Sequence, residues 1–278
     1  MIKKIGFVIL LLFISIFSYM KITNKNINDV GLSLFAFVKK IKGEQVDTAS
    51  LGKSNSVPIS HSGWNTLVAK NVSQKGQVNY KGFIDDKTLL DEYLNLLSEN
   101  PPAKNWSEKE QLAYWINAYN AFTVKLIIDH YPVKTIKQLG GAVTMVNSAW
   151  DIKFFKIGGI DFDLNTIEHQ ILRKNYNEPR IHFAINCASF SCPRLRNEAF
   201  EAAQLDIQLD DQAKQFINNS DKNIITTEGV KLSKIFDWFK SDFIKTETLI
   251  SFLQKYTDVE LSESMEIEYL DYIWSLNE

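Results

Sequence analysis

Two cysteines are the residues whose types and spacing point most directly to chemistry. Cys187 and Cys192 stand in the segment 181–193, which reads IHFAINCASFSCP. In an exported protein, two cysteines so close together predict a disulfide, whose short loop contributes about 2 kcal/mol to stability. The competing interpretation is a single nucleophilic thiolate at Cys187 that is activated by His169 or His182.

Other uses of the cysteine pair fit its spacing less well. A zinc site needs further suitably spaced ligands, and a Cys-x4-Cys pair with one nearby histidine is a poor match. The spacing also differs from the Cys-x-x-Cys of thioredoxin-like redox sites, so a redox role ranks last. The chain holds four histidines and two cysteines in total, and we therefore expect no metal and no cofactor.

A second group of polar residues gathers on a predicted helix that Asn165 is expected to cap. Glu168 falls among apolar positions at the helical period, and His169 lies at the edge of that apolar face. Arg173 stands near the end of the same helix. Such a cluster is typical of a functional site, although Glu168 at the third helical position also fits a helix cap.

Two asparagines interrupt the most apolar helix of the chain. Ser107 and Glu110 have the spacing of a capping box, and the helix that they open continues toward Asp129 with apolar residues on all sides. Asn117 and Asn120 lie three positions apart on one face of this buried helix. Either they satisfy neighbouring backbone groups and fix the packing, or they face a cleft.

The elements that position these residues do not alternate regularly between helix and strand. The sequence therefore predicts an α+β fold: a single mainly helical domain with two short β-hairpins and a C-terminal strand, preceded by an N-terminal hydrophobic signal or anchor helix. The expected helices, besides the two above, cover residues 64–72, 89–97 and 205–216. The expected strands cover residues 154–157, 160–162, 224–226, 230–232 and 266–273.

The N-terminus predicts export. Residues 1–20 open with Met-Ile-Lys-Lys and continue as a charge-free apolar run, typical of a signal peptide or membrane anchor. No small-x-small cleavage motif follows, which favours an uncleaved anchor over release. We expect the protein to be anchored in the inner membrane and to face the periplasm, or to be secreted. Residues 21–60 are the predicted linker, and residues 61–278 the predicted globular domain.

Composition limits the partners. The chain has 278 residues with 45% hydrophobic residues, which is ordinary for a globular protein. Its 31 basic and 33 acidic residues give a net charge of −2, so there is no basic excess to bind nucleic acid. The expected partners are the membrane, through the N-terminal segment, and an unknown small-molecule or peptide ligand.

Three ordered motifs carry a family resemblance. Residues 115–121 read WINAYNA, residues 167–173 read IEHQILR, and residues 180–187 read RIHFAINC, with SCP at 191–193. Together they resemble the family of domain of unknown function 547, over a core of about residues 107–216. The resemblance implies a shared fold and site, but it supplies no reaction.

Two hypotheses follow, and whether the chain is an enzyme stays open between them. The favoured one is an extracytoplasmic binding or scaffold module with a structural cysteine pair. The alternative is a thiol-dependent hydrolase or transferase that acts on an acyl or peptide-like bond. Its roles would be filled by Cys187 as nucleophile, His169 or His182 as base, Glu168 as orienting carboxylate, and Asn117 or Asn120 as oxyanion donor. In either case, we expect the three motifs to meet around one pocket.

Overall fold

The structure is a computed structural model that describes residues 51–52, 56–140 and 148–278. The predicted signal or anchor over residues 1–20, and most of the linker predicted over residues 21–60, lie outside the described residues. Within the described part of the chain, no helix is both long enough and apolar enough to span a membrane.

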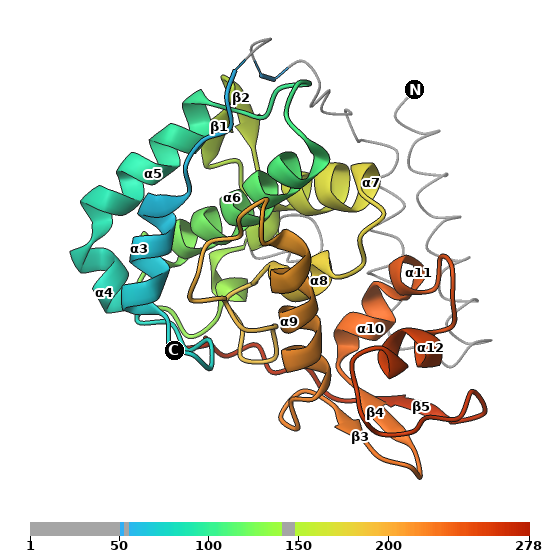
Figure 1. Cartoon of the computed structure of the whole chain (residues 1–278). Helices are drawn as coiled ribbons and strands as arrows, with labels where there is room; N and C mark the ends of the chain where they lie inside the picture. The colour runs from blue at the N-terminus through green and yellow to red at the C-terminus, as the bar shows by residue number, and fades with distance from the viewer. Residues whose placement is uncertain (1–50, 53–55, 141–147) are drawn as a thin grey trace, which may run out of the picture.

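One long helix, α6 (Glu108–Ile128), lies at the centre of the molecule with other helices around it (Figure 1). It begins with the predicted capping box: the Ser107 hydroxyl accepts a hydrogen bond from the Glu110 amide, and the Glu110 carboxylate accepts one from the Ser107 amide. From Leu112 onward almost every side chain is buried, because apolar residues occupy all faces of the helix. The predicted central, buried helix is therefore confirmed.

Three helices precede α6 and cover one side of it. They are α3 (Ser62–Asn71), α4 (Tyr80–Asp85) and α5 (Lys87–Glu99). Helices α4 and α5 contact α6, while α3 lies against α4 and α5. The Trp64 ring stacks on Phe83 and Tyr93, with ring centroids 5.9 and 6.0 Å away, which joins the three helices through aromatic packing.

The first predicted hairpin is present as β1 (Phe155–Ile157) and β2 (Ile160–Phe162), which pair antiparallel. Gly158 and Gly159 form its turn with φ values of 60° and 82°, a conformation that glycine adopts without steric cost. The Gly158 amide donates a hydrogen bond to the Ser98 carbonyl at 2.8 Å. The turn is thereby fixed to the end of α5.

The motif that carries Glu168 is wound as a π-helix, η4 (Thr166–Leu172). The predicted cap at Asn165 is wrong, because Asn165 already has helical dihedrals and its side chain makes no capping hydrogen bond. The Asp163 carboxylate takes that role and accepts a hydrogen bond from the Thr166 amide at 2.7 Å. Short π-helical segments occur often at functional sites, since the extra residue per turn redirects side chains.

Three further helices continue the chain: α7 (Arg173–Asn175), α8 (Ile181–Ala184) and α9 (Leu205–Ile217). Helix α8 lies between two separate hydrophobic clusters. Ile181 belongs to the cluster around α6, whereas Phe183 belongs to the cluster around the C-terminal elements. The short segment before the cysteines therefore joins the two halves of the core.

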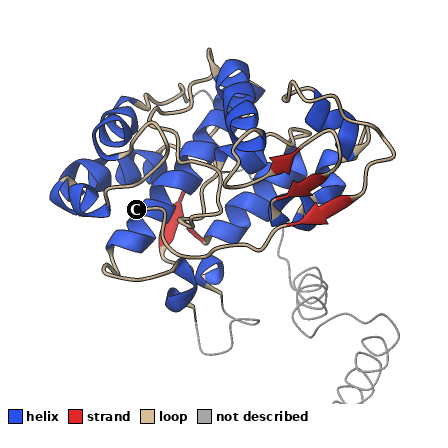
Figure 2. Cartoon of the chain, turned by 90° about the horizontal axis from the view of Figure 1, so that it is seen from below, coloured by secondary structure: helices blue, strands red, loops and turns tan. Residues whose placement is uncertain are grey.

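The C-terminal part combines short helices with a small sheet, which Figure 2 shows apart from the hairpin β1–β2. Its elements are β3 (Ile224–Ile225), β4 (Val230–Leu232), α10 (Lys234–Trp238), α11 (Lys240–Phe243), α12 (Leu249–Gln254) and β5 (Ile267–Tyr269). Strand β4 pairs antiparallel with β3, as predicted for the second hairpin, and parallel with the predicted C-terminal strand β5. Helices with two small sheets confirm the α+β class.

The last residues, 270–278, run from β5 back toward the N-terminal helices, and we name them the C-terminal strap (Figure 1). The Ser275 carbonyl accepts a hydrogen bond from the Phe190 amide at 2.7 Å. The Asn277 carbonyl accepts one from the Val78 amide at 2.8 Å. The strap thus bonds both to the segment between the two cysteines and to the segment that precedes α4.

The buried His61 predicts loss of stability in mild acid. Its pKa is lowered from 6.5 to about 4 because burial penalises the charged imidazole, while its Nδ1 lies 2.7 Å from the Tyr93 hydroxyl. The unfolded chain binds a proton here below pH 6.5 and the folded protein does not, so this stability is complete above pH 6.5. It decreases by about 3 kcal/mol as the pH falls to about 4.

We expect His61→Gln to lose less stability between pH 7 and pH 4.5 than the wild type, measured by urea unfolding at each pH. His130→Gln changes an exposed histidine after α6 and is the matched control. An equal loss in His61→Gln and the wild type would contradict the assignment of this pH dependence to His61.

Candidate functional site

The two asparagines of α6 act as clamps on other chain segments. The Asn120 Nδ2 donates to the Ala184 carbonyl at 2.9 Å, and its Oδ1 accepts from the Asn186 amide at 2.8 Å. The Asn117 Nδ2 donates to the Phe200 carbonyl at 2.8 Å, and its Oδ1 accepts from the Phe200 amide at 3.0 Å. In both side chains the oxygen and the nitrogen are used by buried backbone, which fixes the packing around α6.

Residues 187–192 form a tight turn that we name the cysteine loop. Asn186 closes it, because its Nδ2 donates to the Pro193 carbonyl at 2.7 Å and its Oδ1 accepts from the Ala188 amide at 2.8 Å. Ala188 has φ of 60°, in the left-handed region that residues with a Cβ seldom adopt. The turn reverses the chain and brings both ends of the loop together.

The two thiols meet at the base of this loop. The sulphur atoms of Cys187 and Cys192 lie 2.7 Å apart, and the Cys187 amide donates to the Cys192 Sγ at 2.9 Å. Both cysteines are free in this structure, and the disulfide expected from the sequence stays a prediction. Cys187 is half-buried, whereas Cys192 is 6% exposed.

Hydroxyl groups surround the Cys187 sulphur. The Ser189 Oγ lies 3.1 Å from it and the Tyr272 hydroxyl 3.3 Å, while the Ser189 hydroxyl also donates to the Tyr272 oxygen at 3.0 Å. Burial opposes ionisation of Cys187, but hydrogen bonds from Cys192, Ser189 and Tyr272 outweigh it and lower the pKa of the thiol. Burial raises the pKa of Cys192, as does the neighbouring Cys187.

The two candidate histidines belong to a different cluster. The His182 Nε2 donates to the Asp242 Oδ2 at 2.9 Å, and the Arg173 Nε donates to the same oxygen at 2.5 Å. The Arg173 Nη1 lies 3.1 Å from the His169 Nδ1. His182 also stacks on the Phe239 ring, with centroids 4.0 Å apart. We name His169, Arg173, His182 and Asp242 the histidine cluster.

The surroundings of this cluster shift the pKa values of His182 and Asp242. Burial lowers the pKa of His182 and keeps its ring neutral, although the bond to Asp242 opposes this shift. Burial alone would raise the pKa of Asp242, but hydrogen bonds from His182 and Arg173 outweigh it and lower that pKa. The His182 Nδ1 is buried and makes no hydrogen bond within the described residues. The cluster therefore holds a carboxylate beside a neutral imidazole.

Glu168 lies close enough to His182 for its charge to oppose the lowering of the His182 pKa. It is 7% exposed and accepts a hydrogen bond from the Tyr119 hydroxyl of α6 at 3.3 Å. The pKa of Tyr119 is raised, first by burial and then by the charges of Glu168, Cys187 and Cys192. Glu168 and the two cysteines, which belong to different chain segments, are thus all close enough to Tyr119 to raise its pKa.

Hydrogen bonds along α6 connect the first motif to the second and to the third, while the pocket that the motifs are expected to share stays a prediction. Asn120 contacts the backbone before Cys187, and Tyr119 contacts Glu168. The side-chain hydrogen bonds of Cys187 with described residues come from Cys192, Ser189 and Tyr272. The base expected from the sequence therefore does not hydrogen-bond the candidate nucleophile.

Sequence reasoning missed Asp242 and Tyr272. Asp242 is 60 positions from His182, and Tyr272 is 85 positions from Cys187, so no local pattern connects either pair. One feature of the sequence could have indicated these two residues: each stands next to aromatic residues, Asp242 in WFKSD and Tyr272 in YIW.

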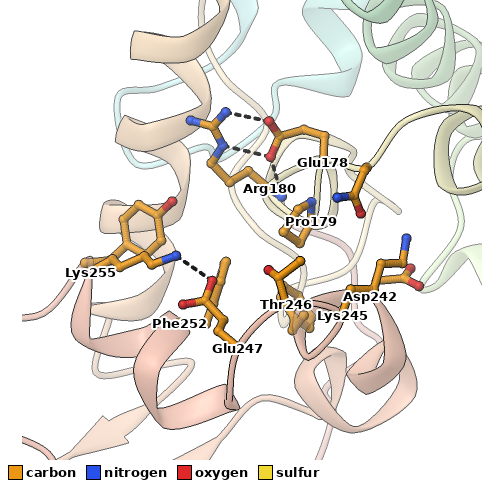
Figure 3. Close-up of a pocket in the computed structure, with 12 residues that line it drawn as sticks. Glu178, Pro179, Arg180, Asp242, Lys245, Thr246, Glu247, Phe252 and Lys255 are labelled. Atoms are coloured by element: carbon orange, nitrogen blue, oxygen red, sulfur yellow. Dashed lines mark hydrogen bonds and ion pairs between the residues drawn. The ribbon is translucent and has the colours of Figure 1, made fainter.

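A cavity of about 190 Å³ lies beside the histidine cluster, between residues 177–180 and 242–256 (Figure 3). Its charged lining residues are Glu178, Arg180, Asp242, Lys245, Glu247 and Lys255. The Arg180 guanidinium pairs with Glu178 on one side of the opening, and Lys255 pairs with Glu247 at 2.5 Å on the other (Figure 3). Asp242 belongs both to this lining and to the histidine cluster.

Metal ligation finds no support in the geometry. Among the residues that the structure describes, no group of three or more histidine, cysteine, aspartate or glutamate side chains is arranged to hold a metal ion.

Comparison with known proteins agrees with the resemblance read from the motifs. Residues 103–217 match the family described as "Protein of unknown function, DUF547", which confirms the suspected family and closely matches the predicted core of 107–216. Searches of curated proteins and of solved structures found no match. The family match covers α6, the π-helix η4, the cysteine loop and α9, but not Asp242 or Tyr272.

We expect Asn120→Leu to destabilise the protein by about 2 kcal/mol, because the Ala184 carbonyl and the Asn186 amide would lose their buried partner. The measurement is the free energy of unfolding in urea. Asn95→Leu, on the exposed side of α5, is the matched control and should change it by less than about 0.5 kcal/mol. An equally small change in Asn120→Leu would show that the clamp contributes nothing to stability.

Proposed function

We propose that this chain is an extracytoplasmic binding module, exported or anchored by its N-terminal segment, that takes a small ligand carrying both a positive and a negative charge. The observation that carries the proposal is the cavity beside the histidine cluster, whose lining combines cations, carboxylates and aromatic rings. In this module Asn120 holds the start of the cysteine loop on α6.

The charges of the cavity favour a zwitterion. Arg180 and Lys255 are already paired with carboxylates, whereas Lys245 forms no ion pair within the described residues. Asp242 has its Oδ2 bonded to His182 and Arg173. Among the residues that the structure describes, its Oδ1 bonds only to the Ser241 hydroxyl, at 3.3 Å. A ligand carboxylate would pair with Lys245, and a ligand ammonium with the Asp242 Oδ1.

The size of the cavity limits the ligand. About 190 Å³ is below the range of about 300–1,000 Å³ that is usual for drug-sized ligands. A free amino acid has a matching size and carries both charges, and a dipeptide carries one of the two charges at each end. The Phe252 and Tyr256 rings of the lining offer apolar surface to the side chain of such a ligand.

The thiol-hydrolase alternative has less support. It needs a base at the Cys187 sulphur, but His182 donates to Asp242 and His169 faces Arg173. It also needs a free amide as oxyanion donor, and both atoms of the Asn117 and Asn120 amides already bond to backbone. Both asparagine amides and the His182 Nε2 thus already have partners in the fold, which supports the binding module over the hydrolase.

Titration calorimetry tests the binding proposal on the full-length protein. Alanine and the dipeptide Ala-Ala are the probes, with propionate and ethylamine as analogues that each keep one charge. We expect the zwitterions to bind and the analogues to bind at least about tenfold more weakly, since each loses one charge-assisted hydrogen bond.

Lys245→Ala should weaken binding of the zwitterions about tenfold or more, while leaving the melting temperature unchanged. Lys240→Ala removes an exposed lysine of α11 outside the cavity and is the matched control. Equal affinity in the two variants, or no binding of any probe by the wild type, would overturn the cavity as the ligand site.

The location is tested separately. Cells that express the full chain with a C-terminal tag should carry it in the membrane fraction, where protease added outside the cytoplasmic membrane digests it. Removal of residues 1–20 should leave the tagged protein in the soluble cytoplasmic fraction. Recovery of the full chain in the cytoplasm would refute the export proposal.

A further inference from the structure

The two cysteines differ in their exposure to solvent. Cys187 is half-buried, so part of it is open to solvent, whereas Cys192 lies beneath it and is 6% exposed. The hydroxyl oxygens of Ser189 and Tyr272 lie within hydrogen-bond distance of the Cys187 sulphur, at 3.1 and 3.3 Å. A partly exposed cysteine whose sulphur contacts that of a more deeply buried cysteine is the arrangement in which one cysteine attacks and the other resolves.

The cysteine loop is held independently of any bond between its sulphurs. Asn186 ties its two ends, and the C-terminal strap accepts hydrogen bonds from the amides of Phe190 and Ser191. On the outer side, Lys222 lies 3.8 Å above the Phe190 ring and donates to the Phe190 carbonyl. With the loop fixed in this way, the sulphurs stay in contact whether they are bonded or not.

We propose that Cys187 and Cys192 form a thiol–disulfide exchange site that acts on an accessible disulfide of a second molecule. This activity goes beyond ligand binding and is independent of the cavity beside the histidine cluster. The long spacing between the cysteines does not prevent it, because the left-handed turn at Ala188 reverses the chain and brings the sulphurs within 2.7 Å.

The exchange proceeds in two balanced steps. The Cys187 thiolate attacks one sulphur of the substrate disulfide; an S–S bond forms, the substrate S–S bond breaks, and one substrate thiolate leaves. Cys192 then gives its proton to the departing thiolate and attacks the Cys187 Sγ, which releases the second substrate thiolate. Two electrons pass to the substrate, which becomes two thiols, while Cys187 and Cys192 become a disulfide.

The lowered pKa of Cys187 and the raised pKa of Cys192 agree with this order. A thiol with a lowered pKa is the better attacking group at neutral pH, and it is also the better leaving group when the bridge is reduced again. Tyr272 is a positioning residue in this scheme, since it acts through its hydrogen bond to the Cys187 sulphur.

The test uses the full-length protein, reduced and freed of reductant, with oxidised glutathione as the first probe and insulin disulfides as the second. Acid-quenched samples are alkylated and weighed by mass spectrometry. The wild type should lose two hydrogens and release two substrate thiols per chain. Cys192→Ser should stop as a mixed disulfide at Cys187. Cys187→Ser should react at least about tenfold more slowly than the wild type, because its remaining thiol is buried.

Tyr272→Phe distinguishes thiolate stabilisation from a structural role. We expect a several-fold slower reaction at neutral pH and a pH profile moved to higher pH, with recovery of the rate in alkali. Tyr131→Phe removes a hydroxyl that bonds to the Glu278 carboxylate and not to a cysteine, and is the matched control. If the pH profile of Tyr272→Phe equals that of the wild type, Tyr272 does not stabilise the Cys187 thiolate.

Two outcomes would overturn the exchange site itself. One is a wild type that accumulates the glutathione adduct without an internal bridge, or that does not react with either probe. The other is a Cys192→Ser variant that reacts no faster than Cys187→Ser. Either result leaves the binding of zwitterions to the cavity unaffected, so the two proposals fail separately. A faster reaction with oxidised glutathione than with insulin would indicate that the substrate is a small disulfide. A faster reaction with insulin would indicate that the substrate is a protein disulfide.

Discussion

The arrangement of the candidate site depends on one buried hydrogen-bond pair, between the Asn120 amide and the backbone of Ala184 and Asn186. Helix α6 is apolar on all sides, so any polar group packed against it must find its partner there or lose stability. Asn120 is that partner, and it fixes the distance between the helix and the start of the cysteine loop. Asn186 acts in the same way on the next segment, because its side chain donates a hydrogen bond to the Pro193 carbonyl at the end of the loop.

This constraint also separates the two kinds of chemistry in the motifs. The short helix α8 carries His182 toward Asp242, and the chain that leaves it carries Cys187 toward Tyr272. Tyr119 of α6 bonds to Glu168. Asp242 lines the cavity and bonds to the neutral His182 imidazole, while the thiols form a separate centre that bonds to Tyr272 of the C-terminal strap. The separation favours binding and thiol exchange over a single hydrolytic site.

Much of the fold follows from local sequence signals. The capping box at Ser107 and the two adjacent glycines at Gly158 predict the start of α6 and the turn of the first hairpin, because each depends on neighbouring residues alone. The short helices α10 to α12 were not predicted, since four to six residues are too few for a hydrophobic period to be visible. The cap of the π-helix was misplaced, because Asn165 and Asp163 both suit a cap and only the backbone dihedrals decide between them.

The sequence by itself determined which residues are out of place in an apolar core: the asparagines of α6, Glu168 and the two cysteines. It also determined that they belong to one family pattern, since residue type and order suffice for that. Only the tertiary structure decided how they pair. Asp242 and Tyr272 reach the site from 60 and 85 positions away, and hydrogen bonds over such separations leave no trace in local periodicity. They exist because packing of the two hydrophobic clusters brings distant segments together, and that packing is a property of the whole chain.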